Sequence, residues 1–303
     1  GGGEALREGA GCGGLGSAEA TRECMRRVPV EDLLRFPTSN HAHFPLSPIL
    51  DWGPVVDGVT VERRPLDAVQ QGSFNDAAEV VIGSAKNDGS VFGLALPLLS
   101  DKLGWPETML RGLVDRIFGP AAGKAILRQF PRKGFVLGVY PQIDEIVTDY
   151  LFRCSARRFA RALASRGRPA WLYEFSYAFQ GSKYRALGDY HTSENKWLFG
   201  GKGSDLHLTG ADAAMQAALQ GYWGNFSAGG DPNGAGGRGG GVAGAQSPAK
   251  LPAWPVISET HPSIMILTQN PAAAPAAGAS SAPREAACDF WDGVAPLIVH
   301  GGA

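Results

Sequence analysis

The sequence has no long hydrophobic run and no excess of charge of one sign. No apolar stretch in its 303 residues approaches the ~18 that a membrane-spanning helix needs. Lysine and arginine number 28 against 29 aspartates and glutamates, which leaves a formal net charge of −1. Proteins that neutralise nucleic-acid phosphates carry a basic field, and none is present here. The composition therefore predicts no transmembrane segment and no nucleic-acid partner.

The start of the chain lacks both a methionine and a signal peptide. Residues 1–4 read Gly-Gly-Gly-Glu, and no basic segment followed by an apolar one comes after them. We expect the chain to be a fragment of a longer protein, with residues that its chemistry needs lying upstream.

Cysteine is scarce and does not have the spacing of a metal site. Cys12, Cys24, Cys154 and Cys288 form no C-x-x-C motif and no short cluster with histidine, so we expect no metal site and no cofactor. Four cysteines allow three pairings into two disulfides, and four reduced thiols are the alternative. The short separation favours Cys12 with Cys24, a loop whose closure stabilises a fold by about 3 kcal/mol in the chain-entropy model.

Glycine and proline, by contrast, are abundant, with 42 and 21 residues, too many for a helical bundle. They concentrate in two stretches that hold too little apolar surface to offset the entropy of ordering the chain. We expect flexible insertions at about 229–250 and 271–284, within one partial domain that spans 1–303.

Short β-branched or aromatic runs predict strands, and apolar residues at helical spacing predict helices. The expected strands are 80–82, 171–177 and 264–267, and the expected helices lie around 109–117, 143–163, 210–227 and 288–294. Five arginines in the second helix predict a solvated face: Arg153, Arg157, Arg158, Arg161 and Arg166. Buried strands separated by long helices predict an α/β fold with a mostly parallel sheet flanked by helices.

The chain lacks the usual motifs of a nucleophile or a phosphate site. No serine lies in a G-x-S-x-G elbow, and no glycine-rich loop ends in G-K-[ST]. Two loops that follow expected strands remain as candidates. Asp88 follows the first strand, where α/β enzymes keep catalytic loops, although Asp88-Gly89 also fits a common turn. His191 follows the second strand and can exchange protons near neutral pH, although a solvated histidine is the alternative.

Together these two loops resemble the C-terminal half of the type-B carboxylesterase and cholinesterase family of α/β hydrolases. The acid segment of that family has the form G-x-x-x-[DE]-E-G-x-x-F, and Gly83–Phe92 follows it with Asn87-Asp88-Gly89 where Asp-Glu-Gly is usual. The histidine segment begins H-x-x-[ED] and closes with F-G, as His191–Gly200 does. Further landmarks are Pro54–Gly58, Tyr222–Phe226, Gly230–Asn233 and Cys288–Trp291.

The resemblance implies the C-terminal portion of an α/β-hydrolase fold and hydrolysis of carboxylic esters through a Ser-Asp-His triad. It implies that His191 is the general base and acid and that Asp88 is the carboxylate that orients it. The serine and the oxyanion-hole glycines of the family lie upstream of these segments. We therefore expect the chain to hold two triad members, to lack the nucleophile and to be inactive alone.

The resemblance also implies pairing of Cys12 with Cys24 and of Cys154 with Cys288, and hence a secreted protein or one of the secretory pathway. The implied substrate is a small-molecule or lipid ester. A catalytically inactive, cholinesterase-like adhesion or binding protein is the alternative function. A binding protein has no use for the pair, so the presence of both Asp88 and His191 favours the esterase. Asn225-Phe226-Ser227 is formally a glycosylation sequon, which we expect to be unmodified.

Overall fold

The computed structural model describes residues 2–35, 54–93, 107–131, 141–178, 187–199, 210–234, 251–258, 263–268, 272–275 and 282–297. The chain divides into two compact units. The first comprises Gly1–Glu62, Trp105–Leu127 and Pro296–Ala303, and the second comprises Arg63–Gly104 and Arg128–Ala295. The organisation of 1–303 as one partial domain stays a prediction.

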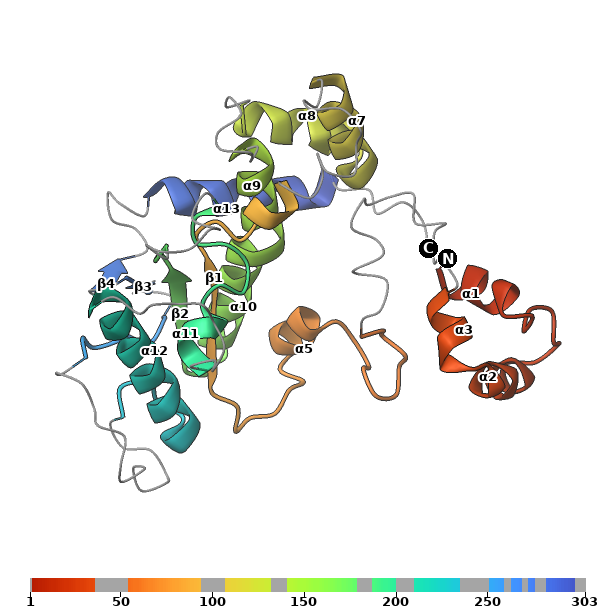
Figure 1. The fold of residues 1–303 in the computed structure, drawn as a ribbon, viewed down its shortest axis with the longest axis horizontal. Coiled ribbons are helices and arrows are strands. Elements are labelled where there is room, and N and C mark those ends of the chain that lie inside the picture. Colours follow the sequence, from red (N-terminus) through yellow and green to blue (C-terminus); the bar gives the residue numbers. More distant parts are fainter. Residues whose placement is uncertain are drawn as a thin grey trace. The chain divides into compact units, whose positions relative to one another are not determined.

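The sheet lies in the second unit and has the strand order β1-β2-β3-β4 (Figure 1). β1 (Val80–Ala85), β2 (Ala170–Phe175) and β3 (Ser263–Leu267) are parallel, and β4 (Ala272–Pro275) runs antiparallel to β3. The three strands expected from β-branched and aromatic runs are thus confirmed, as is the mostly parallel sheet.

β4 corrects part of one expectation, because it lies within the stretch 271–284 that composition predicted to be a flexible insertion. Its small residues pair through the backbone with Ser263–Ile266, so it needs little apolar side-chain area of its own. Helix α13 (Ala282–Val294) also begins inside that stretch. In the other expected insertion, α12 ends at Gly229 and a turn occupies 231–234. Residues 235–250 lie outside the described residues.

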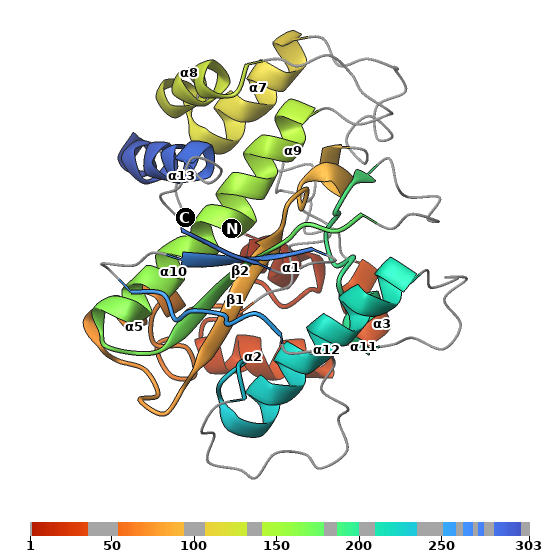
Figure 2. The same cartoon turned by 90° about the vertical axis from the view of Figure 1, so that its left-hand side faces the viewer.

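Helices cover both faces of the sheet, and the alternation of side chains along each strand separates two cores (Figure 2). On one face Trp171 and Phe175 pack with α11 (Asn195–Phe199) and α12 (Gly210–Gly229). On the other face the neighbouring Leu172 packs with α5 and α10. The bounds are α5 Pro65–Gln71, α9 Pro141–Val147, η1 Thr148–Arg153, α10 Cys154–Ser165 and η3 Ala295–Leu297.

The long helix expected around 143–163 is present, but it is interrupted by a turn of π-helix. α9, η1 and α10 follow one another without a break, and the N–H of Cys154 donates to the carbonyl of Asp149, five residues earlier. Single π turns inside α-helices are frequent at functional sites. Apolar periodicity predicted the helix and carried no sign of this turn.

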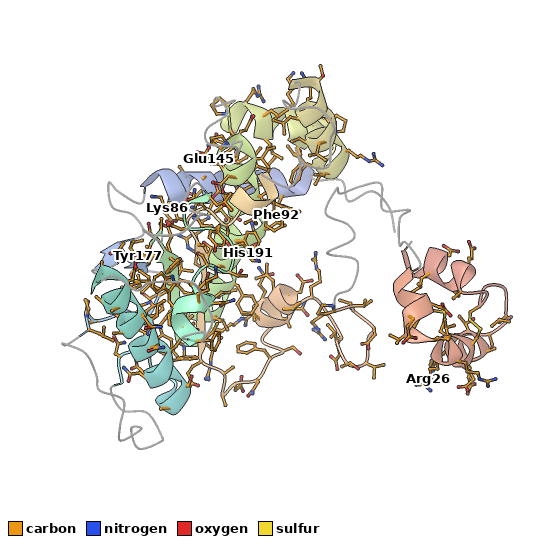
Figure 3. All side chains as sticks on the ribbon, viewed as in Figure 1. Arg26, Lys86, Phe92, Glu145, Tyr177 and His191 are labelled. Atoms are coloured by element: carbon orange, nitrogen blue, oxygen red, sulfur yellow. A yellow bond between two sulfur atoms is a disulfide. The ribbon has the colours of Figure 1, made fainter. Side chains whose placement is uncertain are left out.

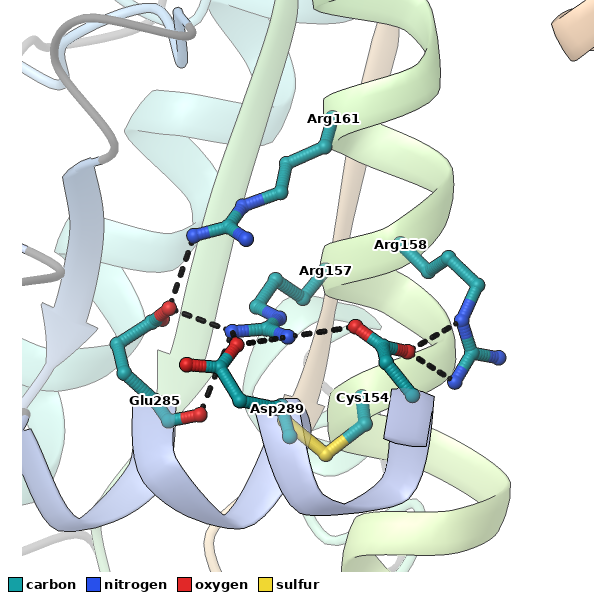
Figure 4. Close-up of polar contacts among 8 residues, drawn as sticks. Cys154, Arg157, Arg158, Arg161, Glu285 and Asp289 are labelled. Atoms are coloured by element: carbon teal, nitrogen blue, oxygen red, sulfur yellow. Dashed lines mark hydrogen bonds and ion pairs between the residues drawn. A yellow bond between two sulfur atoms is a disulfide. The ribbon is translucent and has the colours of Figure 1, made fainter. Parts of the chain in front are cut away.

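The arginines of α10 correct the expectation of a solvated face. Arg157 is only 3% exposed, and its guanidinium contacts Glu285, Asp289 and Asp292 of α13 at 2.6, 2.9 and 2.8 Å (Figure 4). Arg158 and Arg161 bind the same row of carboxylates, and the Cys154–Cys288 disulfide joins the same two helices. We call this set of ion pairs and its disulfide the α10–α13 contact. The carboxylates that bury Arg157 lie more than 120 residues away, so the sequence of α10 alone does not indicate them.

The described residues of the first unit form helices and loops, with no strand among them. The Cys12–Cys24 disulfide links the loop after α1 to α2, as the loop length favoured. Ser17 caps α2 by accepting a hydrogen bond from the N–H of Ala20 at 3.1 Å. The helices are α1 Gly2–Gly9, α2 Ala18–Arg27, α3 Val30–Arg35 and α7 Glu107–Phe118, followed along the chain by α8 Pro120–Gln129. No helix among the described residues has the length and apolarity needed to cross a membrane.

Candidate active site

Asp88 lies in a tight loop at the carboxyl end of β1. This acid loop, residues 86–89, turns so that the Asp88 side chain folds back, and its Oδ2 accepts a hydrogen bond from the N–H of Ala85 at 2.7 Å. The carboxylate is buried. The next residue must be glycine, because a Cβ on Gly89 would lie 2.2 Å from the carbonyl oxygen of Asp144. The Asp88-Gly89 turn and the loop that carries the candidate carboxylate are thus the same structure here.

His191 lies in a second loop, residues 187–194, at the same end of the sheet. Asn87 and Tyr190 form an isolated parallel bridge just beyond the carboxyl end of β1. This pairing brings together two residues 103 positions apart, and His191 Nδ1 lies 2.8 Å from Asp88 Oδ1. Thr192 follows with a φ of 64°, a conformation that costs a β-branched residue on the order of 1–3 kcal/mol.

The carboxylate controls the charge and tautomer of the imidazole. The carboxylate of Asp88 accepts a hydrogen bond from Nδ1–H, so the neutral ring carries its free lone pair on Nε2. The hydrogen bond to Asp88 raises the pKa of His191 above 6.5, against the opposing effect of burial. The side chain is 39% exposed, and no hydrogen-bonding group in the described part of the chain reaches Nε2. The geometry is that of a base that is oriented on one side and open on the other.

Comparison with known proteins identifies the family of this chain. The sequence pattern of the Carboxylesterase family matches residues 3–291. The chain belongs to the carboxylesterase family. It is 24% identical to an acetylcholinesterase of Leptinotarsa decemlineata over 81% of this chain, and 27% identical to human neuroligin-2 over 74%. It spans only 38% and 28% of those two relatives.

Solved structures show the same fold. The chain superposes on the EstA protein of Aspergillus niger with a TM-score of 0.69 and 20% identity, covering 97% of this chain and 55% of that one. A PNB esterase gives a TM-score of 0.65 and 19% identity over 93% of this chain and 52% of the other. The predicted α/β-hydrolase fold and the predicted family are therefore confirmed. The catalytic roles of Asp88 and His191 stay predictions.

Three buried polar atoms beside the Asp88–His191 pair of this carboxylesterase-family chain have no partner among the described residues. They are Ser90 Oγ, Ser193 Oγ and Glu194 Oε2. Burial raises the pKa of Glu194, and the nearby Asp88 charge raises it further, while His191 opposes this. Buried polar groups in folded proteins are nearly always hydrogen-bonded to protein or to ordered water.

Sequence patterns did not indicate that the π-helical turn contributes to the site. The ring centroid of Phe152 lies 4.8 Å from that of His191. The ring of Phe92, which Figure 3 labels together with His191, lies 5.9 Å from the His191 ring. Thr148 accepts a hydrogen bond from the N–H of Gly89 at 2.8 Å. Phe152 and Thr148 reach the two loops from a helix far away in the sequence, whereas Phe92 lies in the acid motif that the resemblance used. No group of three or more His, Cys, Asp or Glu residues within the described ranges is arranged to hold a metal ion.

Proposed function

We propose that the chain is the part of a carboxylic ester hydrolase that supplies the base and its orienting carboxylate. The observation that supports this most directly is the 2.8 Å contact between Asp88 and His191 Nδ1, with Nε2 open. Membership of the carboxylesterase family supports the same reaction class. The proposal assigns the general base and acid to His191 and the orienting role to Asp88.

The proposed reaction follows from that geometry. A serine Oγ forms a bond to the ester carbonyl carbon while Nε2 of His191 takes the hydroxyl proton. Asp88 stabilises the imidazolium formed in this step. When the acyl–oxygen bond breaks, Nε2 returns the proton to the departing alcohol. In the second half of the reaction, water attacks the carbonyl carbon of the acyl-enzyme while Nε2 takes a proton from it. Nε2 returns that proton to the serine oxygen as the carboxylic acid leaves.

We propose that the serine comes from upstream sequence of the same protein, since no serine of this chain lies in a G-x-S-x-G elbow. The position of β1 supports this, because β1 is at one edge of the sheet formed by the described residues. A further parallel strand beside it would end at the same rim as the acid loop, where α/β folds place their ligands.

The proposed substrate is a small-molecule or lipid ester. Phe92 and Phe152 lie near the imidazole with ring centroids 6.1 Å apart, which suits an apolar substituent near the reacting carbon. The two disulfides support a location in the secretory pathway.

A fluorophosphonate probe tests the proposal, because an activated serine displaces its fluoride and retains the phosphonyl group. The protein with its upstream coding sequence should be labelled at one upstream serine, and His191→Ala and Asp88→Asn should abolish labelling. The 303-residue chain alone should remain unlabelled. Stoichiometric labelling of the chain alone would contradict an upstream nucleophile, and an unlabelled full protein would contradict the esterase.

The second candidate is a catalytically inactive binding protein, which the match to neuroligin-2 fits. The upstream coding sequence separates the two functions. A serine in a G-x-S-x-G elbow favours the esterase, and any other residue at that position favours the binding protein.

A further inference from the structure

We propose that the Asn87–Asp144 hydrogen bond is a positioning contact. It joins the acid loop, residues 86–89, to the histidine loop, residues 187–194, and to helix α9, and so fixes the position of Asp88. This inference rests on the proposed function only in what the positioning is for. Asn87 and Asp144 touch neither of the two side chains that would react, so they are positioning residues and not catalytic ones.

Asn87 is hydrogen-bonded to the segment that precedes His191, and it directly precedes Asp88 itself. Its backbone N–H donates to the carbonyl of Asp189 at 3.2 Å, and its Oδ1 accepts from the N–H of Asp189 at 3.5 Å. It also forms the parallel bridge to Tyr190. The residue that precedes Asp88 is thus hydrogen-bonded to Asp189, which lies two residues before His191.

The side-chain nitrogen of Asn87 is hydrogen-bonded to a residue of α9. Nδ2 of Asn87 donates to Oδ2 of Asp144 at 2.8 Å. Oδ1 of Asp144 accepts from the hydroxyl of Thr148 at 2.9 Å, and that hydroxyl accepts from the N–H of Gly89. The residues immediately before and after Asp88 are therefore both bonded to the junction of α9 and η1.

Two glycines make room for this arrangement, which is independent evidence that the close approach is built into the sequence. A Cβ on Gly188, which has a φ of +64°, would lie 2.5 Å from Oδ1 of Asn87. A Cβ on Gly89 would strike the backbone of Asp144. Both loops can reach Asn87 and α9 only because these positions carry no side chain.

The chemistry of the contact requires an amide at position 87. An asparagine accepts from the Asp189 N–H with its oxygen and donates to Asp144 with its nitrogen. An aspartate there would place a second carboxylate against a buried one. Asp144 is only 7% exposed, and burial raises its pKa against the hydrogen bonds from Asn87 and Thr148. The carboxylate of Asp144 therefore depends on these donors.

The test measures the titration of His191 by NMR in protein labelled at histidine Cε1, with the signal assigned through His191→Gln. The variants are Asp144→Asn and Asp144→Ala. Both remove the same charge, but only the asparagine retains an oxygen that can accept from Asn87. Asn87→Ala removes the donor itself. The remaining histidines, His41, His43, His207, His261 and His300, serve as internal controls.

We expect the pKa of His191 to stay near the wild-type value in Asp144→Asn and to be lower by about 1 in Asp144→Ala and Asn87→Ala, because Asp88 loses its place beside the ring. Asp88→Asn removes the charged partner of the ring, so its change in the His191 pKa is the largest that loss of the Asp88–His191 contact can cause. Equal values in Asp144→Asn, Asp144→Ala and Asn87→Ala would overturn the inference. If Asp144→Ala does not fold, Asn87→Ala at the half-buried position decides the outcome.

This measurement needs no ester turnover, so it is separate from the test of the proposed function. A protein that fluorophosphonate does not label can still show the Asn87 effect. If Asp88→Asn itself leaves the pKa of His191 unchanged, the Asp88–His191 pair fails, and with it the proposed triad.

Discussion

Two contacts between distant parts of the chain show how differently a carboxylesterase-family protein can join such segments. The α10–α13 contact joins residues 134 positions apart with a disulfide and a row of ion pairs. The Asp88–His191 contact joins residues 103 positions apart with one hydrogen bond, supported by the neutral amide of Asn87. We infer that the first contact holds the fold together and that the second sets the geometry of one proton-accepting group.

The largest effect should come from the weaker contact. In the protein with its upstream sequence, Asp88→Asn should lower the rate of ester hydrolysis by about 10⁴-fold, because the imidazole is left in the wrong tautomer. The free energy of unfolding should change far less, on the order of 1–3 kcal/mol. Turnover of a chromogenic ester and urea denaturation measure the two quantities. Wild-type turnover in Asp88→Asn would remove Asp88 from the proposed triad.

Removing the Cys154–Cys288 disulfide should give the next largest effect, and on stability rather than chemistry. The Cys154→Ala/Cys288→Ala variant frees a loop whose ends are 134 residues apart, and we expect a loss of about 2–5 kcal/mol. Cys12→Ala/Cys24→Ala, with a separation of 12, is the matched control and should lose less. Urea unfolding measures both. A larger loss from the short loop would contradict the assignment of the α10–α13 contact as the stronger support.

Within the α10–α13 contact, the buried arginine should matter more than its exposed neighbour. Arg157→Ala leaves three carboxylates without their shared partner, and we expect a loss of about 2 kcal/mol, moderated because Asp289 and Asp292 are 67% and 42% exposed. Arg158→Ala should cost less than about 1 kcal/mol. Both values come from denaturant midpoints, and equal losses would show that burial of Arg157 is of no consequence. Neither variant should move the pKa of His191.

The smallest effect concerns the carboxyl group of Asp189, which lies within the histidine loop, residues 187–194. Burial raises the pKa of Asp189 from 3.8 to about 6, so its ionised form is disfavoured in the folded state. The sign follows from linkage: ionisation costs nothing extra below about pH 4, and the cost grows until pH passes about 6. Relative to wild type, Asp189→Asn should therefore be more stable at pH 8 than at pH 4, by about 1–2 kcal/mol.

Denaturant unfolding of both proteins at the two pH values checks this. Asp88 and His191 remain unchanged in Asp189→Asn, so the variant separates the stability of the histidine loop from the hydrogen bond that we assign to function. A stability difference that does not depend on pH would show that Asp189 titrates normally.

Much of the fold followed from local patterns. β-branched and aromatic runs predicted β1, β2 and β3, and apolar spacing predicted α7, α12 and the helix that contains α10. β4 escaped prediction because backbone pairing with β3 stabilises it and not its own alanines. The π-helical turn escaped because apolar spacing indicates a helix and carries no signal for a hydrogen bond that spans five residues instead of four.

For the site, the motifs identified Asp88 and His191 but not what holds them. Asn87 stood inside a recognised motif with no role of its own, and Asp144 and Thr148 lay within an amphipathic helix where short polar residues carry no signal. Their importance comes from one junction of α9 and η1 that meets the acid loop. A pattern along the chain cannot report such a meeting, because it depends on the packing of three separate segments.

The sequence by itself determined the family, the parallel sheet and the two residues that face each other. Strand patterns and short motifs are local, so each is contained in a short stretch of the chain. Only the tertiary structure decided which polar groups support them, which arginine of α10 is buried and where the long helix widens into a π turn. The first two properties depend on carboxylates and a hydroxyl brought from more than 50 residues away, and hydrogen bonds act over a few ångströms of space without regard to separation along the chain.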